Sequence, residues 1–194
     1  MKKLLITGFE PFDGEKTNPS WDAVAMLPEK IGGYTLTKMC VPVVFGEAAR
    51  EVISKAQELD PDAILCIGQA GGRAAITPEL VGINLRHARI PDNNGNHPID
   101  EEIICGGDAA YFSTLSVRRI AEAIKAQGIP AELSYSAGAY VCNDLLYTLL
   151  HEYKNSTTRV AFIHVPYSSD QSKEPSMSIS DIIKGLVIAV ENLD

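Results

Sequence analysis

The sequence predicts an α/β fold in which a mostly parallel sheet carries helices on both faces. Short apolar or β-branched stretches alternate along the chain with longer amphipathic ones, as strands and helices do in this class. The segment DAILCIG is almost uniformly apolar, which is typical of a central parallel strand covered on both faces. The chain of 194 residues, 45% of them hydrophobic, is long enough for one sizeable hydrophobic core and short for two domains. We therefore expect a single domain over residues 1–194.

In the first half, three strands are expected because their residues are apolar or β-branched, and two helices because apolar positions recur at helical spacing. A polar loop with Pro and Gly follows the first strand, and a second polar loop closes this half. The expected elements are, in order, strand 3–9, loop 10–20, helix 21–28, strand 34–43, helix 46–59, strand 62–68, one or two extended segments in 76–90, and loop 91–102.

The second half repeats this alternation. Ser113 or Thr114 is expected to cap a helix that Gly128 and Pro130 end. AELSYS is expected to be the next strand, and VAFIH is an apolar run that ends the strand after it. The expected elements are helix 115–128, strand 131–136, a helix starting at Cys142, strand 159–167, loop 168–176 and helix 177–193.

Charge and cysteine patterns limit the partners and the compartment. The net charge is −8 and the 17 basic residues are scattered, so the chain lacks the basic patch that nucleic acid or an anionic membrane requires. We expect no nucleic-acid partner and no membrane partner. The apolar run after Lys2 and Lys3 is too short for an export signal, so we expect a soluble, cytoplasmic protein. The four cysteines form no C-x-x-C pair, which argues against a disulfide framework and a zinc site.

The strand order along the chain points to the loops that form the site. Ligands of open α/β sheets bind where parallel strands end, at their carboxyl edge. The loops expected there are residues 9–19, 69–73, 137–142 and 164–167. Cys142 and His164 thus fall on one edge of the sheet.

Cys142 is expected at a helix start, where unpaired N–H groups and the helix dipole lower the pKa of a thiol and can hold an oxyanion. Gly138 allows the incoming turn a conformation that other residues resist. A free cysteine more often packs as a small apolar residue. We expect that role for Cys66 and Cys40, and no role for Cys105. At Cys142 the helix start and the histidine on the same edge keep both roles open.

His164 ends an apolar strand just before Pro166, and paired with a helix-start thiol it is the candidate general base. The other histidines, at 87, 97 and 151, lie in polar or charged segments and are expected at the surface. A third group should orient the imidazole. The residues alone leave five candidates for it: Glu79, Asp92, Asn143, Asp144 and Asp170.

Six stretches in this order resemble the pyroglutamyl peptidase type I family, the pyrrolidone-carboxylate peptidases. They cover nearly the whole chain: TGFEPF with NPSW, IGQAGGRAAITPELVGIN, ARIPDNNGN, AAYFSTL, SAGAYVCN and FIHVPY. The resemblance implies a cysteine peptidase on an open three-layer α/β/α sandwich that removes N-terminal pyroglutamate from small peptides. It further implies a homotetramer and no cofactor.

Carried over position by position, the resemblance implies Cys142 as nucleophile, His164 as base and Glu79 as the acid. The catalytic cycle that it implies runs through a thioester acyl-enzyme. The sequence departs from the family pattern after the acid, where Leu80 stands in place of a basic residue and Gly82 in place of an alanine. Because no positive charge follows Glu79, we expect activity with an altered rate or pH profile. The loop after Pro166 is also short for the family.

The pyroglutamyl ring is a flat, uncharged lactam, which calls for an apolar pocket with a few neutral hydrogen-bonding groups. Phe9 and Phe12 are expected to sandwich the ring, a role for which the alternative is a loop that folds its aromatic side chains back onto the sheet. The remaining substrate-binding candidates are Tyr140 and Val141 beside the nucleophile, Gln69 and Asn18 as polar partners or loop anchors, and Arg89 as an aid to the oxyanion or a salt-bridged surface residue.

The sequence also allows two other function classes. The glycines of GQAGGR suggest a phosphate- or nucleoside-binding module, but they match neither G-x-G-x-x-G nor a P-loop. A non-catalytic binding module on the same scaffold would need a defect in the site, since Cys142, His164 and Glu79 are all present.

Overall fold

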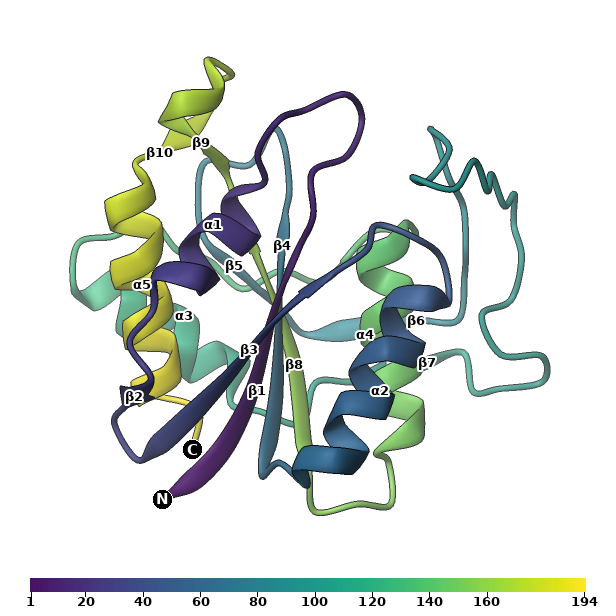
Figure 1. Ribbon diagram of the computed structural model, residues 1–194, viewed down its shortest axis with the longest axis horizontal. Helices are drawn as coiled ribbons and strands as arrows, with labels where there is room; N and C mark the ends of the chain where they lie inside the picture. The colour runs from purple at the N-terminus through teal and green to yellow at the C-terminus, as the bar shows by residue number, and fades with distance from the viewer.

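A six-stranded sheet forms the centre of the computed structural model, which describes residues 1–194, with the strand order β2-β3-β1-β4-β8-β5 (Figure 1). The strands are β1 (Lys2–Phe9), β2 (Lys30–Ile31), β3 (Tyr34–Val41), β4 (Ala63–Gln69), β5 (Thr77–Glu79) and β8 (Arg159–Val165). Neighbours among β3, β1, β4 and β8 run parallel, while the two edge strands β2 and β5 are antiparallel to their neighbours. The predicted mostly parallel sheet is confirmed.

Helices cover both faces of this sheet, which confirms the three-layer α/β/α architecture (Figure 1). On one face lie α1 (Pro19–Met26), α3 (Val117–Ala126) and α5 (Ile179–Glu191). On the other lie α2 (Glu47–Leu59) and α4 (Val141–Glu152).

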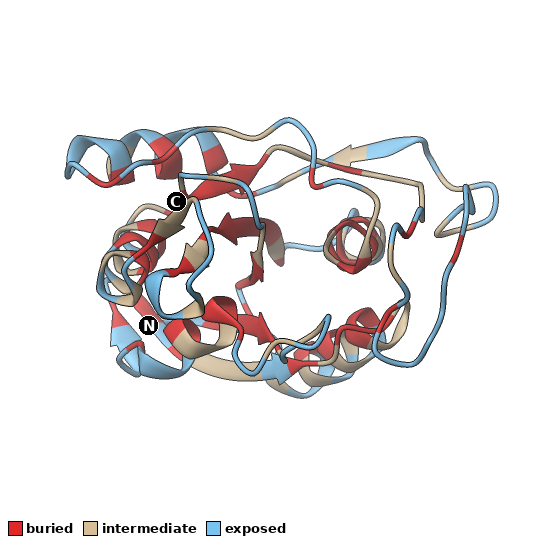
Figure 2. Ribbon diagram, turned by 90° about the horizontal axis from the view of Figure 1, so that it is seen from above, coloured by how far each residue is buried: buried red, intermediate tan, exposed pale blue.

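Each face has its own hydrophobic core because side chains alternate along a strand. In β1, Leu4 and Ile6 join the core under α1, α3 and α5, whereas Leu5 joins the core under α2 and α4. Buried residues accordingly line the facing sides of the sheet and the helices (Figure 2). Cys66 is buried in the second core as expected, but the expectation for Cys40 is wrong: it is exposed near the end of β3, close to the sheet edge.

Two local expectations in the second half are also wrong. Residues 131–136 form no continuous strand. Ala131 bridges to Ile76, just before β5, and Ser134 bridges to Glu79 of β5. The pairing is this short because β5 is three residues long and contains Pro78. Neither Ser113 nor Thr114 caps α3, whose N-cap is Ser116. The Ser113 and Thr114 hydroxyls instead bond to the backbone of neighbouring strands.

The remaining elements are short. Within the extended segment 76–90, β6 (Val81–Ile83) follows β5 and pairs with β7 (Ala110–Phe112). After β8 come β9 (Tyr167–Ser168), a 3-10 turn (Ser169–Gln171) and β10 (Ser176–Met177), which pairs with β9. None of the helices combines the length and apolarity needed to cross a bilayer.

Candidate active site

Glu79 and His164 form a buried pair at the edge of the sheet. Strand β5 runs antiparallel to β8, with Thr77 opposite His164 and Glu79 opposite Phe162. The Nδ1 atom of His164 lies 2.7 Å from Oε1 of Glu79. The Glu79 side chain is fully buried and His164 is 4% exposed. With the carboxylate as acceptor, Nδ1 carries the proton and Nε2 is left as the basic nitrogen.

The other four candidates for the third group make different contacts. Asp92 accepts hydrogen bonds from the backbone of its own loop and from Phe45. Asp144 is paired with Arg86, and Asn143 bonds to the backbone of β6. Asp170 is exposed in the 3-10 turn. Only Glu79 meets the imidazole.

Helix α4 begins at Val141, one residue before the predicted start, so Cys142 is its second residue. Its N-cap, Tyr140, offers no side-chain cap to the free N–H groups of the first turn. Gly138 has φ of +76°, the left-handed conformation that glycine was expected to allow. The thiol lies over Gly68, where an added Cβ would stand 2.9 Å from Sγ. Since Gly68 is the β4 neighbour of His164, thiol and imidazole line the same cavity.

The charge state of the site follows from burial and from two neighbouring charges. Burial raises the pKa of the Cys142 thiol to about 12, and the Glu79 charge adds to the rise. Burial lowers the pKa of His164 against the opposing pull of Glu79. Burial alone would raise the pKa of the Glu79 carboxyl, but His164 and Arg73 hold it below its ordinary value. The resting site is thus a neutral thiol, a neutral imidazole and a carboxylate.

This corrects the expectation that the helix N-terminus lowers the pKa of Cys142. The thiol is partly buried and lies near a buried carboxylate, and the effects of these two features on its pKa outweigh that of the helix dipole. Such a thiol needs a base beside it before it can attack.

A cavity of about 510 Å³ opens over Cys142 and His164, and a recess of about 40 Å³ leads off it beside the thiol. The recess has no charged side chain in its wall. Six of the seven substrate-binding candidates line it, together with Val43 and Cys142: Phe9, Phe12, Asn18, Gln69, Tyr140 and Val141. The seventh, Arg89, is exposed on the wall of the larger cavity and takes part in no ion pair.

The side chains around the recess are held in different ways. Phe9 is the last residue of β1, as the expected strand 3–9 has it, and is 2% exposed, so its assignment to the surface loop 9–19 is wrong. Phe12 is in that loop, with its ring 6.4 Å from the ring of Tyr140. Asn18 is a loop anchor, because its side chain caps α1 and donates to the Glu10 carbonyl. Gln69 accepts a hydrogen bond from Gln171.

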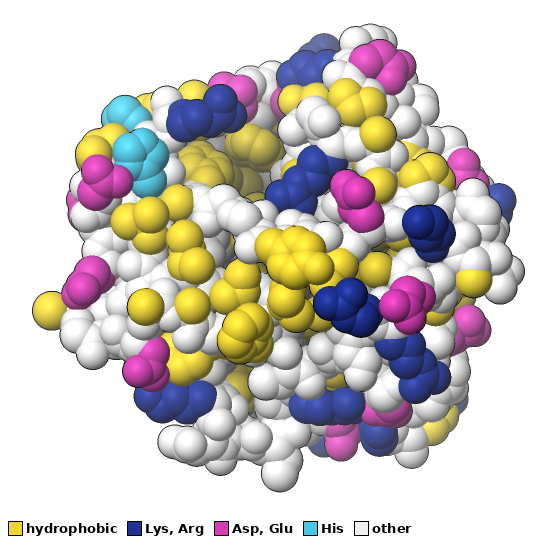
Figure 3. All heavy atoms as spheres, turned by 180° about the vertical axis from the view of Figure 1, so that it is seen from behind, with side chains coloured by type: hydrophobic (Ala, Val, Ile, Leu, Met, Phe, Trp, Pro, Cys, Tyr) yellow, Lys and Arg dark blue, Asp and Glu magenta, His cyan; other side chains and the backbone are white.

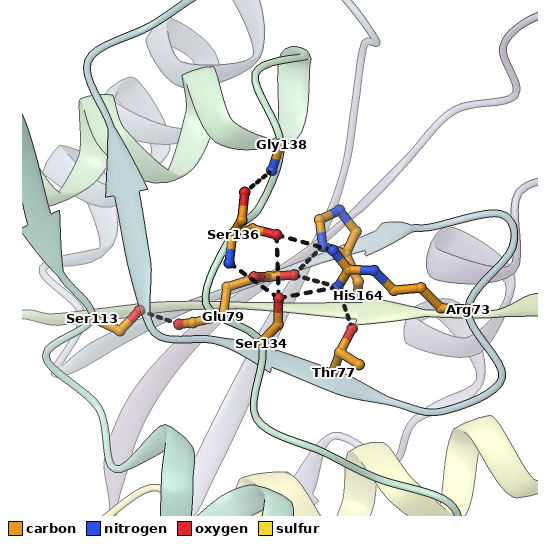
Figure 4. A network of polar contacts seen from close by, with 8 residues as sticks. All are labelled: Arg73, Thr77, Glu79, Ser113, Ser134, Ser136, Gly138 and His164. Atoms are coloured by element: carbon orange, nitrogen blue, oxygen red, sulfur yellow. Dashed lines mark hydrogen bonds and ion pairs between the residues drawn. The ribbon is translucent and has the colours of Figure 1, made fainter.

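Arg73 belongs to this site although the sequence placed it only at the end of a loop. Its Nη1 lies 2.6 Å from Oε1 of Glu79 (Figure 4). The positive charge expected to be missing after Glu79, where Leu80 stands, is therefore supplied from the loop between β4 and β5. The one signal for it in the sequence was its position just after a central strand.

Comparisons with known proteins cover the whole chain. A family model described as pyroglutamyl peptidase matches residues 2–194. The pyrrolidone-carboxylate peptidase of Staphylococcus saprophyticus is 48% identical, over 97% of this chain and 92% of its own. That of Bacillus cytotoxicus is 46% identical, over 98% and 92%.

Solved structures show the same relation. The crystal structure of pyroglutamyl peptidase I from Bacillus amyloliquefaciens matches with a TM-score of 0.95 at 46% identity, over 100% of this chain and 97% of that one. Pyrrolidone carboxyl peptidase from Thermococcus litoralis matches with a TM-score of 0.95 at 38% identity, over 100% and 93%.

Proposed function

Because the chain belongs to the pyroglutamyl peptidase family of cysteine-type omega peptidases, we propose that it removes N-terminal pyroglutamate from peptides with Cys142, His164 and Glu79 as its catalytic residues. One observation carries the assignment of residues. His164 is hydrogen-bonded through Nδ1 to the buried Glu79 and shares a cavity with the thiol of Cys142. This order of acid, imidazole and nucleophile is the one that acyl transfer requires.

In the proposed reaction, Nε2 of His164 takes the proton of the Cys142 thiol while Sγ attacks the pyroglutamyl carbonyl carbon. The tetrahedral intermediate collapses as the C–N bond breaks, and His164 returns the proton to the departing amine. A thioester of pyroglutamate on Cys142 remains. His164 then deprotonates a water that attacks the thioester, and release of pyroglutamate restores the thiol. Glu79 fixes the tautomer and stabilises the imidazolium.

The oxyanion of each tetrahedral intermediate is assigned to the first turn of α4. Its N–H groups lack a side-chain cap at Tyr140, so they are free to donate toward the carbonyl at Cys142. Arg89 adds a positive charge at the cavity wall, where it is exposed and free of ion pairs.

The recess beside Cys142 is assigned to the pyroglutamyl ring. Its aromatic and aliphatic wall, with Gln69 and Asn18 as the polar groups, suits an uncharged lactam and offers no countercharge to a free amine. Phe12 and Tyr140 flank the ring in this assignment, with the buried Phe9 at the base of the recess.

The glycine-rich loop receives a packing explanation instead of a phosphate-binding one. A Cβ on Gly68 would meet the thiol at 2.9 Å, and one on Gly71 would meet the Tyr167 hydroxyl at 2.1 Å. Both glycines are therefore required by close neighbours, and the phosphate- or nucleoside-binding alternative loses its main support.

We extend the proposal to a homotetramer that works in the cytoplasm. Phe112 and Tyr135 are 68% and 65% exposed, and apolar side chains gather at the centre of one face (Figure 3). Burial of such a patch between copies of the chain would stabilise an oligomer. Sedimentation velocity should give the mass of four chains, and a monomer at micromolar concentration would contradict this part. Cell fractionation tests the compartment.

Release of a fluorogenic amine from its pyroglutamyl amide tests the function. We expect turnover of this amide, none of the prolyl amide, loss of turnover in Cys142→Ala, and full turnover in Cys105→Ala, which removes an exposed thiol away from the site. Absence of turnover by the folded, reduced native protein would contradict the proposal.

A further inference from the structure

The carboxylate of Glu79 is held by two groups that converge on one oxygen. His164 Nδ1 approaches Oε1 at 2.7 Å and Arg73 Nη1 approaches the same atom at 2.6 Å (Figure 4). The second oxygen, Oε2, is buried without a hydrogen-bond partner. The orientation of the carboxylate therefore depends on the imidazole and on the guanidinium.

The Arg73 guanidinium is itself held by hydrogen bonds to β5 and to the turn before α4. Nη1 donates to the Thr77 hydroxyl at 2.6 Å, and Thr77 is the β5 residue opposite His164. Nη2 donates to the Ser136 carbonyl at 3.0 Å. Ser136 in turn accepts from the Gly138 N–H through its hydroxyl, in the turn that enters α4. One guanidinium thus connects the strand of the acid to the turn that precedes Cys142.

We propose that Arg73 is a positioning residue of the peptidase, which holds Glu79 in the orientation that receives His164 Nδ1–H and ties this acid to the turn before Cys142. The inference rests on the proposed catalytic role of the three residues. Arg73 acts through Glu79, so its loss should change the rate of the chemical steps more than substrate affinity.

The charges around His164 predict how the pH dependence of kcat/KM should change when Arg73 is removed. The ionisable groups that face it are Glu79 from β5, Arg73 from the loop between β4 and β5, and Cys142 from α4, with Cys66 of β4 behind Cys142. Arg73 is the one positive charge among these four. Its removal raises the pKa of His164 and that of Glu79. Since the active form has a neutral imidazole and an ionised carboxylate, the acid limb of kcat/KM should move to higher pH.

The test compares Arg73→Met, Arg73→Lys and Glu79→Gln with the double variant Arg73→Met/Glu79→Gln. We expect Arg73→Met to lower kcat roughly 10- to 100-fold with KM little changed, because a small displacement of a catalytic group has costs of this order. Arg73→Lys should restore part of the rate and keep the acid limb in place. In the Glu79→Gln background, Arg73→Met should lower kcat little further, since the two residues act as a unit.

Three results would overturn the inference. The first is an acid limb that Arg73→Met leaves unchanged, and the second is a rise in KM with kcat preserved. The third is an equal loss of kcat when Arg73→Met is made in the native enzyme and in Glu79→Gln. A rise in KM would make Arg73 a substrate contact. If Arg73→Met fails to fold because it leaves Glu79 buried without its cation, Arg73→Lys and the double variant, which buries no unpaired charge, carry the comparison. Arg118→Met serves as the control, because Arg118 is exposed on α3, takes part in no ion pair and does not line the cavity.

A second readout needs no pyroglutamyl substrate. The rate at which iodoacetamide alkylates Cys142 is followed against pH by mass spectrometry of the peptide that contains this residue. Arg73→Met should shift this profile and Arg118→Met should not. A shifted alkylation profile in a protein without peptidase activity would support the role of Arg73 and refute the proposed function. An unshifted profile in an active peptidase would support the function and refute the role of Arg73.

Discussion

Substitution of Gly68 by alanine should disable the site through one methyl group. The Cβ would lie 2.9 Å from Sγ of Cys142 and 2.7 Å from Cζ of the Phe162 ring. Carbon atoms in favourable contact are about 3.5–4.0 Å apart, so the thiol or the strand must shift by about 1 Å. Phe162 is fully buried and cannot yield easily.

The expected magnitude follows from that displacement. Misplacing a reacting group by about 1 Å costs on the order of 100-fold in rate, or about 2.7 kcal/mol of transition-state stabilisation. Overpacking of the core should lower the free energy of unfolding by about 1–3 kcal/mol. The rate loss is expected even at temperatures where the variant remains folded.

The assay combines kcat/KM on the pyroglutamyl amide with urea unfolding. Gly33→Ala is the matched control, because an added Cβ there has no neighbour within 4 Å and its φ is ordinary. We expect it to leave kcat/KM unchanged. A Gly68→Ala enzyme with native kcat/KM would refute the placement of the thiol over β4.

Three further predictions concern charge, pH and the loop that forms the recess. Glu79→Gln keeps the shape of the acid but lets the imidazole adopt the wrong tautomer, so kcat should fall roughly 10³- to 10⁴-fold in the same assay, and an effect below tenfold would contradict the role of Glu79. Because burial lowers the pKa of His164 from its ordinary 6.5, the unfolded chain binds this proton first; stability should fall as pH drops below 6.5, and His164→Gln should flatten the decline in urea midpoints. The lowered pKa of Glu79 acts in the same direction at more acid pH, below its ordinary 4.5. Asn18→Ala removes the cap of α1 and the anchor on Glu10, which should lower the free energy of unfolding by about 1 kcal/mol and raise KM, whereas an unchanged KM would separate this anchor from the recess.

The elements that sequence alone predicts well are those whose own residues show directly which side chains are buried. The apolar run of β4 and the amphipathic spacing of α4 each specify burial directly. Strand β4 lies within one residue of both predicted bounds, and α4 begins one residue before its predicted start. Residues 131–136 were predicted poorly because pairing at a short sheet edge depends on the partner, here the three residues of β5.

The site was predictable only in part for the same reason. Parallel strand order was enough to place Cys142 and His164 at one edge, but the acid remained one of five from the residues alone. The contact of Glu79 with His164 arises from antiparallel pairing of β5, which no local pattern indicates. The pKa of Cys142 and the contact of Arg73 with Glu79 are likewise tertiary effects, produced by burial and by a loop conformation.

The most direct test of the central claim is detection of the acyl-enzyme on Cys142. The native protein is mixed with an activated pyroglutamyl aryl ester, so that acylation outruns hydrolysis, then quenched in acid and measured by intact mass and peptide mapping. The account predicts a transient mass increase of one pyroglutamyl group in exchange for one hydrogen, located on Cys142 and absent from Cys142→Ala. Turnover of the ester with no adduct, or with the adduct on another residue, would contradict it.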